Sequence, residues 1–253
     1  MFNFLKKDII VHCYTADAGV YNYSPIGKAI EFIPSWWKDL PKSLPPTDGS
    51  LNIYPTMKTC SGFTDLFSKG FVQPLWSDLL LEIGPQSEIG VDCYRYKFSD
   101  SKSSIQHHSV LQFNNYYPST HYQHLKILSP WELVCDEDVD FLAISPTWTY
   151  DNPEKMIVHS GILNFKYQSG VNINIFWKRE VEETTHHLSV GQPLLHYIPL
   201  SDRKIQLKMH LVSLEEMQKI RQQNASTKFL NKYKYNKKTL KQNGCPFHFK
   251  TEK

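Results

Sequence analysis

The sequence predicts a mainly β protein, organised as a β-sandwich or closed barrel. Short apolar or alternating segments recur between residues 79 and 212, and turn-forming pairs such as Gly84–Pro85, Ser129–Pro130 and Asn152–Pro153 separate many of them. A parallel sheet would require helix-length crossovers between these segments, and the sequence has none there. Of the 253 residues, 41% are hydrophobic and 21% are charged, which is enough apolar material for one sizeable core.

The N-terminal part predicts a strand, short helices and a long loop. Asp8–Tyr14 contains a β-branched run that is typical of a strand. Ser24–Leu40 has apolar residues at three- and four-residue spacing, which predicts a short helix that Pro34 ends or interrupts. Lys42–Ser50 is rich in proline and predicts a loop, and Thr64–Ser68 predicts one helical turn.

The remaining elements are nine strands and a final helix. Ser213–Gln223 begins with Ser213 and has Glu216 three residues later, which is the pattern of a capping box. The predicted strands are Leu79–Ile83, Val91–Phe98, Ser109–Phe113, His124–Val134, Val139–Ser145, Ile157–Phe165, Val171–Trp177, Gln192–Pro199 and Lys204–Val212.

These elements divide the chain into three parts. We expect residues 1–78 to form an N-terminal extension of strand, helices and loop that packs on the core. Residues 79–212 are expected to form the β-sandwich core, and residues 213–253 a C-terminal helix with a lysine-rich tail.

The C-terminal tail is strongly basic. Ala225–Lys253 holds eight lysines against Glu252, although the whole chain has a formal charge of only +3. Such a run is either a solvated arm or a surface for nucleic acid or another acidic partner. Aromatic residues interleave with the lysines, which is compatible with base stacking. The lysines proposed for nucleic-acid contact are Lys228, Lys232, Lys234, Lys237 and Lys238.

The five cysteines are dispersed and form no Cys-x-x-Cys pair. An odd and scattered set argues against a disulfide scaffold and against a structural zinc site. Several of them fall in apolar alternating stretches, so buried and unreactive thiols are expected. The cysteines are Cys13, Cys60, Cys93, Cys135 and Cys245.

Eleven histidines raise the question of a metal site. On a strand, residues i and i+2 face the same side, so a strand-borne iron site normally has His-x-His or His-x-Asp/Glu. No histidine here is followed at the second position by a metal ligand. A ligand set would have to come from separate strands, and His121, His124 and His196 are its candidates. The alternative is that these are surface or hydrogen-bonded core histidines.

Other catalytic motifs are absent from the sequence. There is no Gly-x-Ser-x-Gly elbow, no phosphate-binding P-loop and no Gly-x-Gly-x-x-Gly turn. These absences disfavour the corresponding hydrolases and nucleotide-dependent enzymes, and no catalytic residue is assigned.

Tryptophans beside prolines are the most suggestive positive feature. Trp36, Trp37, Trp76 and Trp131 lie within three residues of a proline. Large planar side chains next to rigid turns form stacking platforms for sugars or bases, or anchors for a partner protein. The same side chains also fill sandwich cores, and this alternative stays open.

Several stretches resemble a group of proteins from tailed phages, especially phages of marine cyanobacteria. This resemblance implies a jelly-roll body of the cupin-like, double-stranded β-helix type. It spans roughly residues 30–200 and does not include the tail. The stretches are Phe32–Lys38 with Leu40–Pro41, Met57–Phe63, Pro74–Asp78, Leu125–Ile127 with Ser129–Trp131, and Val190–Leu195 with Ile198–Leu200.

The stretch from Gly191 to Pro199 also resembles the glycine- and proline-containing turn of cupins. In metal-binding cupins a histidine ligand follows that turn, and His196 occupies such a position. The first cupin motif, with paired histidines and a glutamate, is absent from this chain. The departure puts metal binding in doubt.

The resemblance and the missing motifs together favour a non-enzymatic phage protein. We expect a virion component or binding module that acts through aromatic and loop surfaces, with a protein partner or self-association and no cofactor. One alternative is a non-haem iron or other divalent-metal enzyme, such as a dioxygenase, on the same scaffold. Another is a nucleic-acid-associated protein that acts through the tail.

The expected location is the cytoplasm of an infected bacterial host or the virion. No apolar run approaches the roughly 20 residues of a membrane helix. Met1–Asp8 has two lysines and no long apolar stretch behind it, so a secretory signal peptide is not expected.

Overall fold

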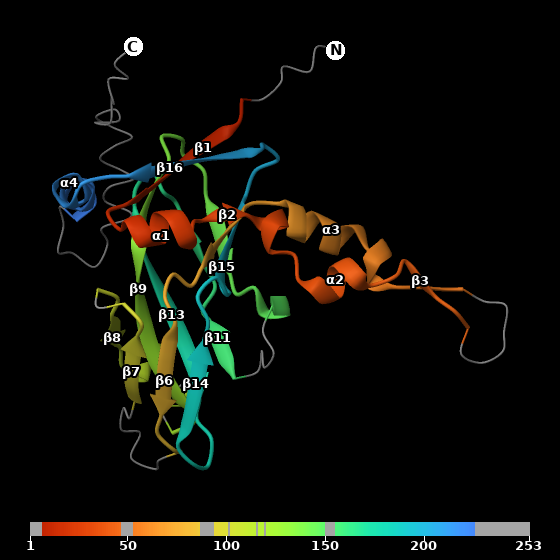
Figure 1. Ribbon diagram of the computed structural model, residues 1–253, viewed down its shortest axis with the longest axis horizontal. Helices are drawn as coiled ribbons and strands as arrows, with labels where there is room; N and C mark the ends of the chain where they lie inside the picture. The colour runs from red at the N-terminus through yellow and green to blue at the C-terminus, as the bar shows by residue number, and fades with distance from the viewer. Residues whose placement is uncertain are drawn as a thin grey trace.

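The computed structural model describes residues 7–46, 53–86, 94–100, 102–114, 116–118, 120–149 and 155–225. Figure 1 shows an upright β body, from which an arm made of α2, α3 and β3 projects to one side. Several antiparallel sheets and a few helices make up the described part, which confirms the prediction of a mainly β protein.

The elements follow one another in this order. They are β1 (Ile9–Thr15), α1 (Ala18–Tyr23), β2 (Gly27–Lys28), η1 (Ala29–Phe32), α2 (Ser35–Asp39), β3 (Ser43–Leu44), β4 (Tyr54–Pro55), η2 (Met57–Thr59), α3 (Ser61–Ser68), β5 (Phe71–Pro74), β6 (Leu79–Ile83), β7 (Tyr94–Phe98), β8 (Ile105–His107), η3 (Val110–Phe113), β9 (Tyr122–Val134), β10 (Phe141–Ile144), η4 (Thr147–Thr149), β11 (Met156–Val158), β12 (Gly161–Leu163), β13 (Gly170–Lys178), β14 (Thr184–Leu188), β15 (Pro193–Pro199), β16 (Ile205–Leu211) and α4 (Leu214–Ala225), where η marks a 3-10 helix.

The largest sheet has the order β11-β13-β9-β1-β16, and β8 also pairs with β9. β1 alternates in burial because every second side chain points into the core, and Ile9, Val11 and Cys13 are fully buried. β1 runs parallel to β16, so the first and the last strands of the chain lie side by side. Residues 1–78, expected as an extension packed on the core, therefore contribute a strand to the middle of a sheet.

A second sheet, β12-β10-β15-β5-β2, faces the first across a shared core. The side-chain amide group of Gln73 on β5 donates to the Ser129 hydroxyl on β9 at 2.8 Å. The Tyr197 hydroxyl on β15 donates to the side-chain oxygen of Gln73 at 3.0 Å. These bonds satisfy polar groups between the sheets. Burying each large apolar side chain, such as Trp131 or Phe141, contributes about 1.5–3 kcal/mol.

A third sheet, β14-β6-β7, continues the core at the lower end of the body in Figure 1. Leu79, Leu81 and Ile83 on β6 are at most 1% exposed and join the same apolar cluster as the two larger sheets. The Trp177 ring on β13 contacts the His186 ring on β14, with centroids 4.5 Å apart. The three sheets therefore share one core.

The arm comprises residues 29–46 and 53–69. Its two limbs meet in the short β3–β4 pairing, where Leu44 lies opposite Tyr54. Trp37 on α2 and Phe67 on α3 are buried between the limbs, with ring centroids 4.9 Å apart. The arm thus has a small aromatic core of its own.

The predicted helix over Ser24–Leu40 is wrong. The segment instead forms β2, the 3-10 turn η1 and the short helix α2. Proline disfavours helical backbone at the residue before it, so Ile33 is extended and Pro34 becomes the residue that precedes α2. The apolar spacing reflected burial of Ile26 and Ala29 against the body, while Ile30 is 53% exposed.

Two strand predictions are also wrong. Ser109–Phe113 contains the 3-10 helix η3, which packs on the outer face of β9 and β13 through contacts between Phe113 and the rings of His124 and Phe176. Ile157–Phe165 contains two strands, β11 and β12, which belong to different sheets. A run of apolar residues does not reveal that the chain crosses from one sheet to the other within it.

The remaining predictions fared better, with some omissions. The structure confirms the other predicted elements, with some differences in where they begin and end. These elements are β1, β6, β7, β9, β10, β13, β15, β16 and α4. The predicted turn Thr64–Ser68 is the second part of the longer helix α3. The helix α1 and the strands β4, β5, β8 and β14 were missed, and β3 lies within the predicted loop Lys42–Ser50. Val91–Cys93, most of the Lys42–Ser50 loop tip and residues 226–253 of the lysine-rich tail lie outside the described residues.

The described cysteines of the body are buried, whereas the described cysteine of the arm is exposed. Cys13 and Cys135 are buried free thiols, as expected, and burial raises the pKa of the Cys135 thiol to about 11. Cys60, on the arm, is exposed and corrects the expectation for that position. In the described residues, no helix is long and apolar enough to cross a membrane.

Candidate functional site

An aromatic joint attaches the arm to the body. The Trp36 indole N–H donates to the main-chain oxygen of Trp148 on η4 at 3.0 Å. The Trp148 ring lies edge-on to Phe67 of the arm and to His196 of the second sheet, with centroids 5.5 and 5.8 Å apart. Edge-to-face ring pairs add about 0.5–1.5 kcal/mol each beyond burial. The joint therefore fixes the direction in which the arm projects.

Hydrogen bonds hold the two limbs of the arm together. The main-chain N–H of Thr56 donates to the Lys42 oxygen at 3.0 Å, and the Thr56 hydroxyl donates to the Pro41 oxygen. The Lys58 ammonium donates to the main-chain oxygens of Trp37 and Lys38 and lies 5.5 Å from the centre of the Trp37 ring. The limbs are thus tied together as one unit.

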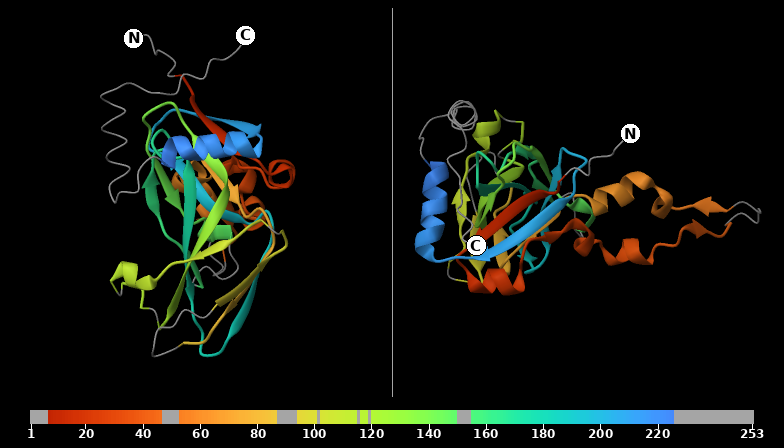
Figure 2. Two further views of the ribbon diagram at one scale, coloured as in Figure 1. Left: turned by 90° about the vertical axis from the view of Figure 1, so that its left-hand side faces the viewer. Right: turned by 90° about the horizontal axis from the view of Figure 1, so that it is seen from above.

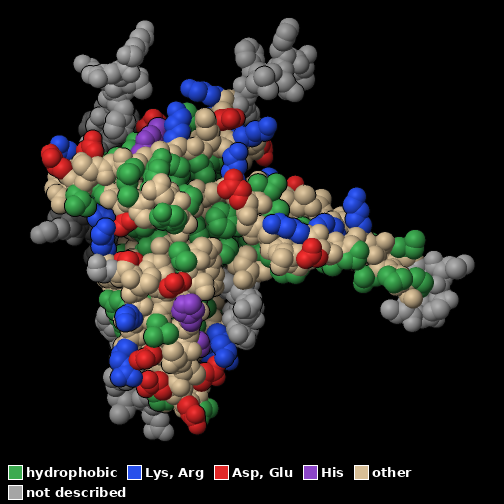
Figure 3. All heavy atoms as spheres, viewed as in Figure 1, with side chains coloured by type: hydrophobic (Ala, Val, Ile, Leu, Met, Phe, Trp, Pro, Cys, Tyr) green, Lys and Arg blue, Asp and Glu red, His purple; other side chains and the backbone are tan. Residues whose placement is uncertain are grey.

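The arm exposes large apolar side chains along its length. Such groups are normally tolerated singly on a surface, whereas a contiguous set marks an interaction site. Figure 3 shows apolar side chains spread over the arm from its base to its far end. The exposed residues are Ile30, Trp36, Leu44, Ile53, Tyr54 and Met57.

A cleft of about 770 Å³ lies on the body, between α1, α4 and the segment that joins β7 to β8. This volume falls in the range of about 300–1,000 Å³ that ligand pockets occupy. Val20, Trp76, Leu128 and Met217 give it an apolar lining. Tyr23, at its edge, is 86% exposed.

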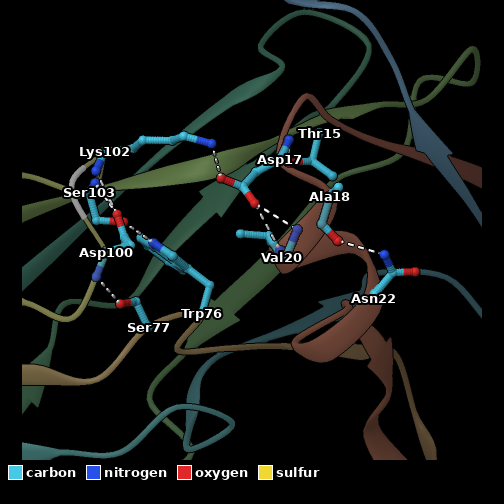
Figure 4. A network of polar contacts seen from close by, with 11 residues as sticks. Thr15, Asp17, Ala18, Val20, Asn22, Trp76, Ser77, Asp100, Lys102 and Ser103 are labelled. Carbon is cyan, nitrogen blue, oxygen red and sulfur yellow. Dashed lines mark hydrogen bonds and ion pairs between the residues drawn. The ribbon is translucent and has the colours of Figure 1, made fainter.

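An ion pair across the cleft joins α1 to the β7–β8 segment. Asp17 precedes α1 and accepts hydrogen bonds from the main-chain N–H groups of Gly19 and Val20, which caps the helix. The Lys102 ammonium donates to the other carboxylate oxygen of Asp17 at 2.9 Å, as Figure 4 shows. This bond from Lys102 is the main cause that lowers the pKa of Asp17, so both groups are charged at neutral pH.

A second carboxylate shapes the turn that carries Lys102. Asp100 accepts hydrogen bonds from the main-chain N–H groups of Lys102 and Ser103 at 2.7 and 2.6 Å. Burial, the largest influence, raises the pKa of Asp100, but hydrogen bonds from Ser77, Ser103 and the main chain together bring it below its usual range. The Trp76 indole N–H donates to the Ser103 hydroxyl at 2.7 Å, which positions the ring against the same turn (Figure 4).

The helix α4 forms the opposite wall of the cleft. Met217 and Ile220 on its inner face pack against Tyr14 and Val134 on the outer face of the large sheet. Arg221 donates to the buried carboxylate of Glu132 at 2.8 Å. Ser213 and Glu216 form the capping box that the sequence predicted, with main-chain bonds of 2.9 and 3.1 Å.

The structure does not bring the four predicted binding tryptophans together. Trp36 and Trp37 lie at the base of the arm, with ring centroids 5.7 Å apart, and Trp36 is 47% exposed. Trp76 lines the cleft, and Trp131 is fully buried in the core. They therefore belong to three different places in the fold.

The three candidate metal ligands also lie apart and have other contacts. His121 forms a 2.7 Å hydrogen bond with the Thr120 hydroxyl, and the buried His124 stacks on Phe176. His196 donates from Nε2 to the main-chain oxygen of Lys69 at 2.7 Å. Within the described ranges, no three side chains of His, Cys, Asp or Glu gather in a way that could hold a metal ion.

The cleft was not predicted from the sequence. Its walls come from segments more than 80 residues apart, as in the pair between Asp17 and Lys102. One local signal was available, because Asp17 stands in the capping position before Ala18–Tyr23. That signal identifies a helix start and not a cleft.

No protein family model matches this chain, and no curated protein is significantly similar to it.

Proposed function

We propose that this is a non-catalytic binding protein that attaches to a protein surface through its arm, as a component of a phage particle or as a docking module. The observation that carries the proposal is the arm itself, which projects from the body (Figure 1). It exposes six large apolar side chains. Exposing these groups to water is unfavourable unless they are covered in an assembly.

The construction of the arm also supports this function. A flexible apolar segment loses conformational entropy when it binds, whereas a segment held in one conformation loses less. The bond from Trp36 to Trp148 and the ring contact between Trp148 and Phe67 hold the arm in place before any partner arrives. The phage origin and the cupin-like form of the body are parts of the proposal that rest on the sequence resemblance.

A matched pair of substitutions tests the proposal. Ile53 on the arm and Ile162 on β12 of the body are 70% and 60% exposed, so a change to aspartate has little effect on folding at either position. Ile53→Asp places a charge on the apolar surface that the partner must cover. We expect quantitative mass spectrometry of gradient-purified particles to find the wild-type chain and Ile162→Asp at stoichiometric levels, and Ile53→Asp strongly depleted.

Two results would contradict the proposal in different ways. If the two variants are retained equally in particles, the arm is not the attachment surface. If the wild-type chain is absent from particles, it is not a particle component, and the docking module must then be found associated with another protein in the cell extract, in a manner that Ile53→Asp disrupts.

A further inference from the structure

The exposed apolar side chains of this protein concentrate at two places. Sixteen large apolar residues of the described part are exposed, six of them on the arm and three of them in the lining of the cleft. The cleft residues are Tyr23, Val190 and Leu214, which are 86%, 46% and 73% exposed. More than half of the exposed apolar residues thus belong to one projecting element and one hollow.

The projection and the hollow lie at opposite ends of the molecule. The right-hand view of Figure 2 shows α4, which forms a wall of the cleft, on one side of the body and the arm extending away from the other side. The aromatic joint around Trp148 fixes the arm in that direction. One copy therefore cannot place its arm in its own cleft, and a second copy can supply what each surface lacks.

The two surfaces are both apolar and are complementary in charge. The outer part of the arm is a two-stranded ribbon, and the cleft is a hollow between two helices and a turn. On the outer part of the arm, Lys42 is exposed and forms no ion pair among the described residues, whereas the exposed Lys38 at the base is followed by the exposed Asp39. Of the charged residues that line the cleft, Lys102 pairs with Asp17 and Arg221 pairs with Glu132. This leaves Asp78 and Asp100 in the lining without a Lys or Arg partner among the described residues. Opposite charges at the two surfaces favour their association and set its orientation.

We propose that the arm of one copy docks in the cleft between α1 and α4 of a second copy. This inference rests on the proposed function of the arm and names its partner. The contact is heterologous, because a different surface of each copy takes part, so an open assembly retains one free arm at one end and one free cleft at the other. The head-to-tail arrangement builds rings or filaments.

Two substitutions separate the two surfaces. Ile53→Asp alters the arm, and Leu214→Asp alters the cleft at the first residue of α4, where an acidic side chain is favourable for the helix. Sedimentation velocity of the full chain at increasing concentration is the measurement, with Ile162→Asp as the control. We expect wild type and the control to associate, and each of the two variants to raise the dissociation constant at least about tenfold.

Mixing the two variants gives the decisive result. Ile53→Asp retains an intact cleft and Leu214→Asp retains an intact arm, so the mixture should form 1:1 dimers that grow no further. If Leu214→Asp associates as wild type does while Ile53→Asp does not, the arm docks elsewhere and this inference is overturned, although the proposed function stands. A monomeric mixture, or a wild-type chain that stays monomeric, also overturns it and points to a different protein or a small ligand as the occupant.

Discussion

At the scale of single residues, the backbone at Gly70 decides how the arm returns to the body. Its φ angle is +77°, which side chains other than glycine rarely adopt, and a Cβ atom there would lie 1.9 Å from the main-chain oxygen of Tyr197. Gly191 also has a positive φ, +82°, but nothing lies within 4 Å of its Cβ position. Substitutions at these two glycines therefore distinguish the energetic cost of a strained backbone from the cost of steric overlap.

We expect Gly191→Ala to lower the free energy of unfolding by about 1 kcal/mol, which is the cost of left-handed backbone alone. Gly70→Ala should lower it by more than about 3 kcal/mol, since β5 and β15 must also move apart. Urea denaturation of both variants gives these values. Equal losses would mean that the overlap at Gly70 is relieved without cost.

Titratable residues predict the dependence of stability on pH. Burial lowers the pKa of His12 and of His196, which stay neutral in the fold at a pH where the unfolded chain is protonated. The pKa of Asp17 is lowered chiefly by its bond from Lys102, and that of Glu137 chiefly by its bond from Arg203. In each case the unfolded state binds more protons, so stability falls as the pH falls.

We therefore expect two stages of acid destabilisation. The histidine contribution is complete above a pH of about 6.5 and is lost as the pH falls toward the lowered histidine pKa values; the carboxylate contribution is lost below a pH of about 4.5. The free energy of unfolding measured at pH values of about 7.5, 5.5 and 3.5 should decrease at each step. A constant value between the first two would exclude the histidine stage.

At the scale of elements, α4 connects the cleft to the large sheet through one buried carboxylate. Glu132 is 5% exposed and accepts bonds from Arg221 on α4 and from the Ser169 hydroxyl. Removing Arg221 leaves a buried charge with one partner fewer, which costs far more than breaking a pair on the surface. Lys219, two residues earlier on α4 and exposed, pairs with Glu215 in such a surface contact.

Arg221→Ala should destabilise the protein by about 1–3 kcal/mol, and Lys219→Ala by at most about 0.5 kcal/mol. Both variants lose a cation from the same helix, and their losses of stability can be compared by thermal denaturation. If both losses are small, the Glu132 carboxylate is satisfied without Arg221.

Elements were predictable where a local pattern was sufficient. The alternation in Ile9–Thr15 and the capping box at Ser213 and Glu216 each depend on neighbours within four residues, and both were recovered. The segment Ser109–Phe113 was mistaken for a strand because the periodicity of a short apolar run does not distinguish a strand from a helical turn. Ile157–Phe165 was taken as one strand because a change of sheet has no local signal.

At the scale of the whole molecule, the positions of the arm and the cleft determine which assemblies are possible. The arm and the cleft are different surfaces on opposite sides of the body (Figure 2), so docking of one in the other is a heterologous contact. A contact of this kind continues from copy to copy unless a ring closes. We expect the weight-average mass of the wild-type chain to rise beyond that of a dimer as concentration increases, whereas a plateau at the dimer mass would indicate a two-fold contact.

The sequence alone determined the mainly β class, most strand positions and the final helix, because periodicity and capping are local properties of the chain. Only the tertiary structure decided that Trp131 fills the core while Trp36 is exposed, and that Asp17 meets Lys102 across a cleft. The same residue types serve buried and exposed roles. Which role each takes depends on contacts between segments that are far apart in the chain, and no local pattern records them.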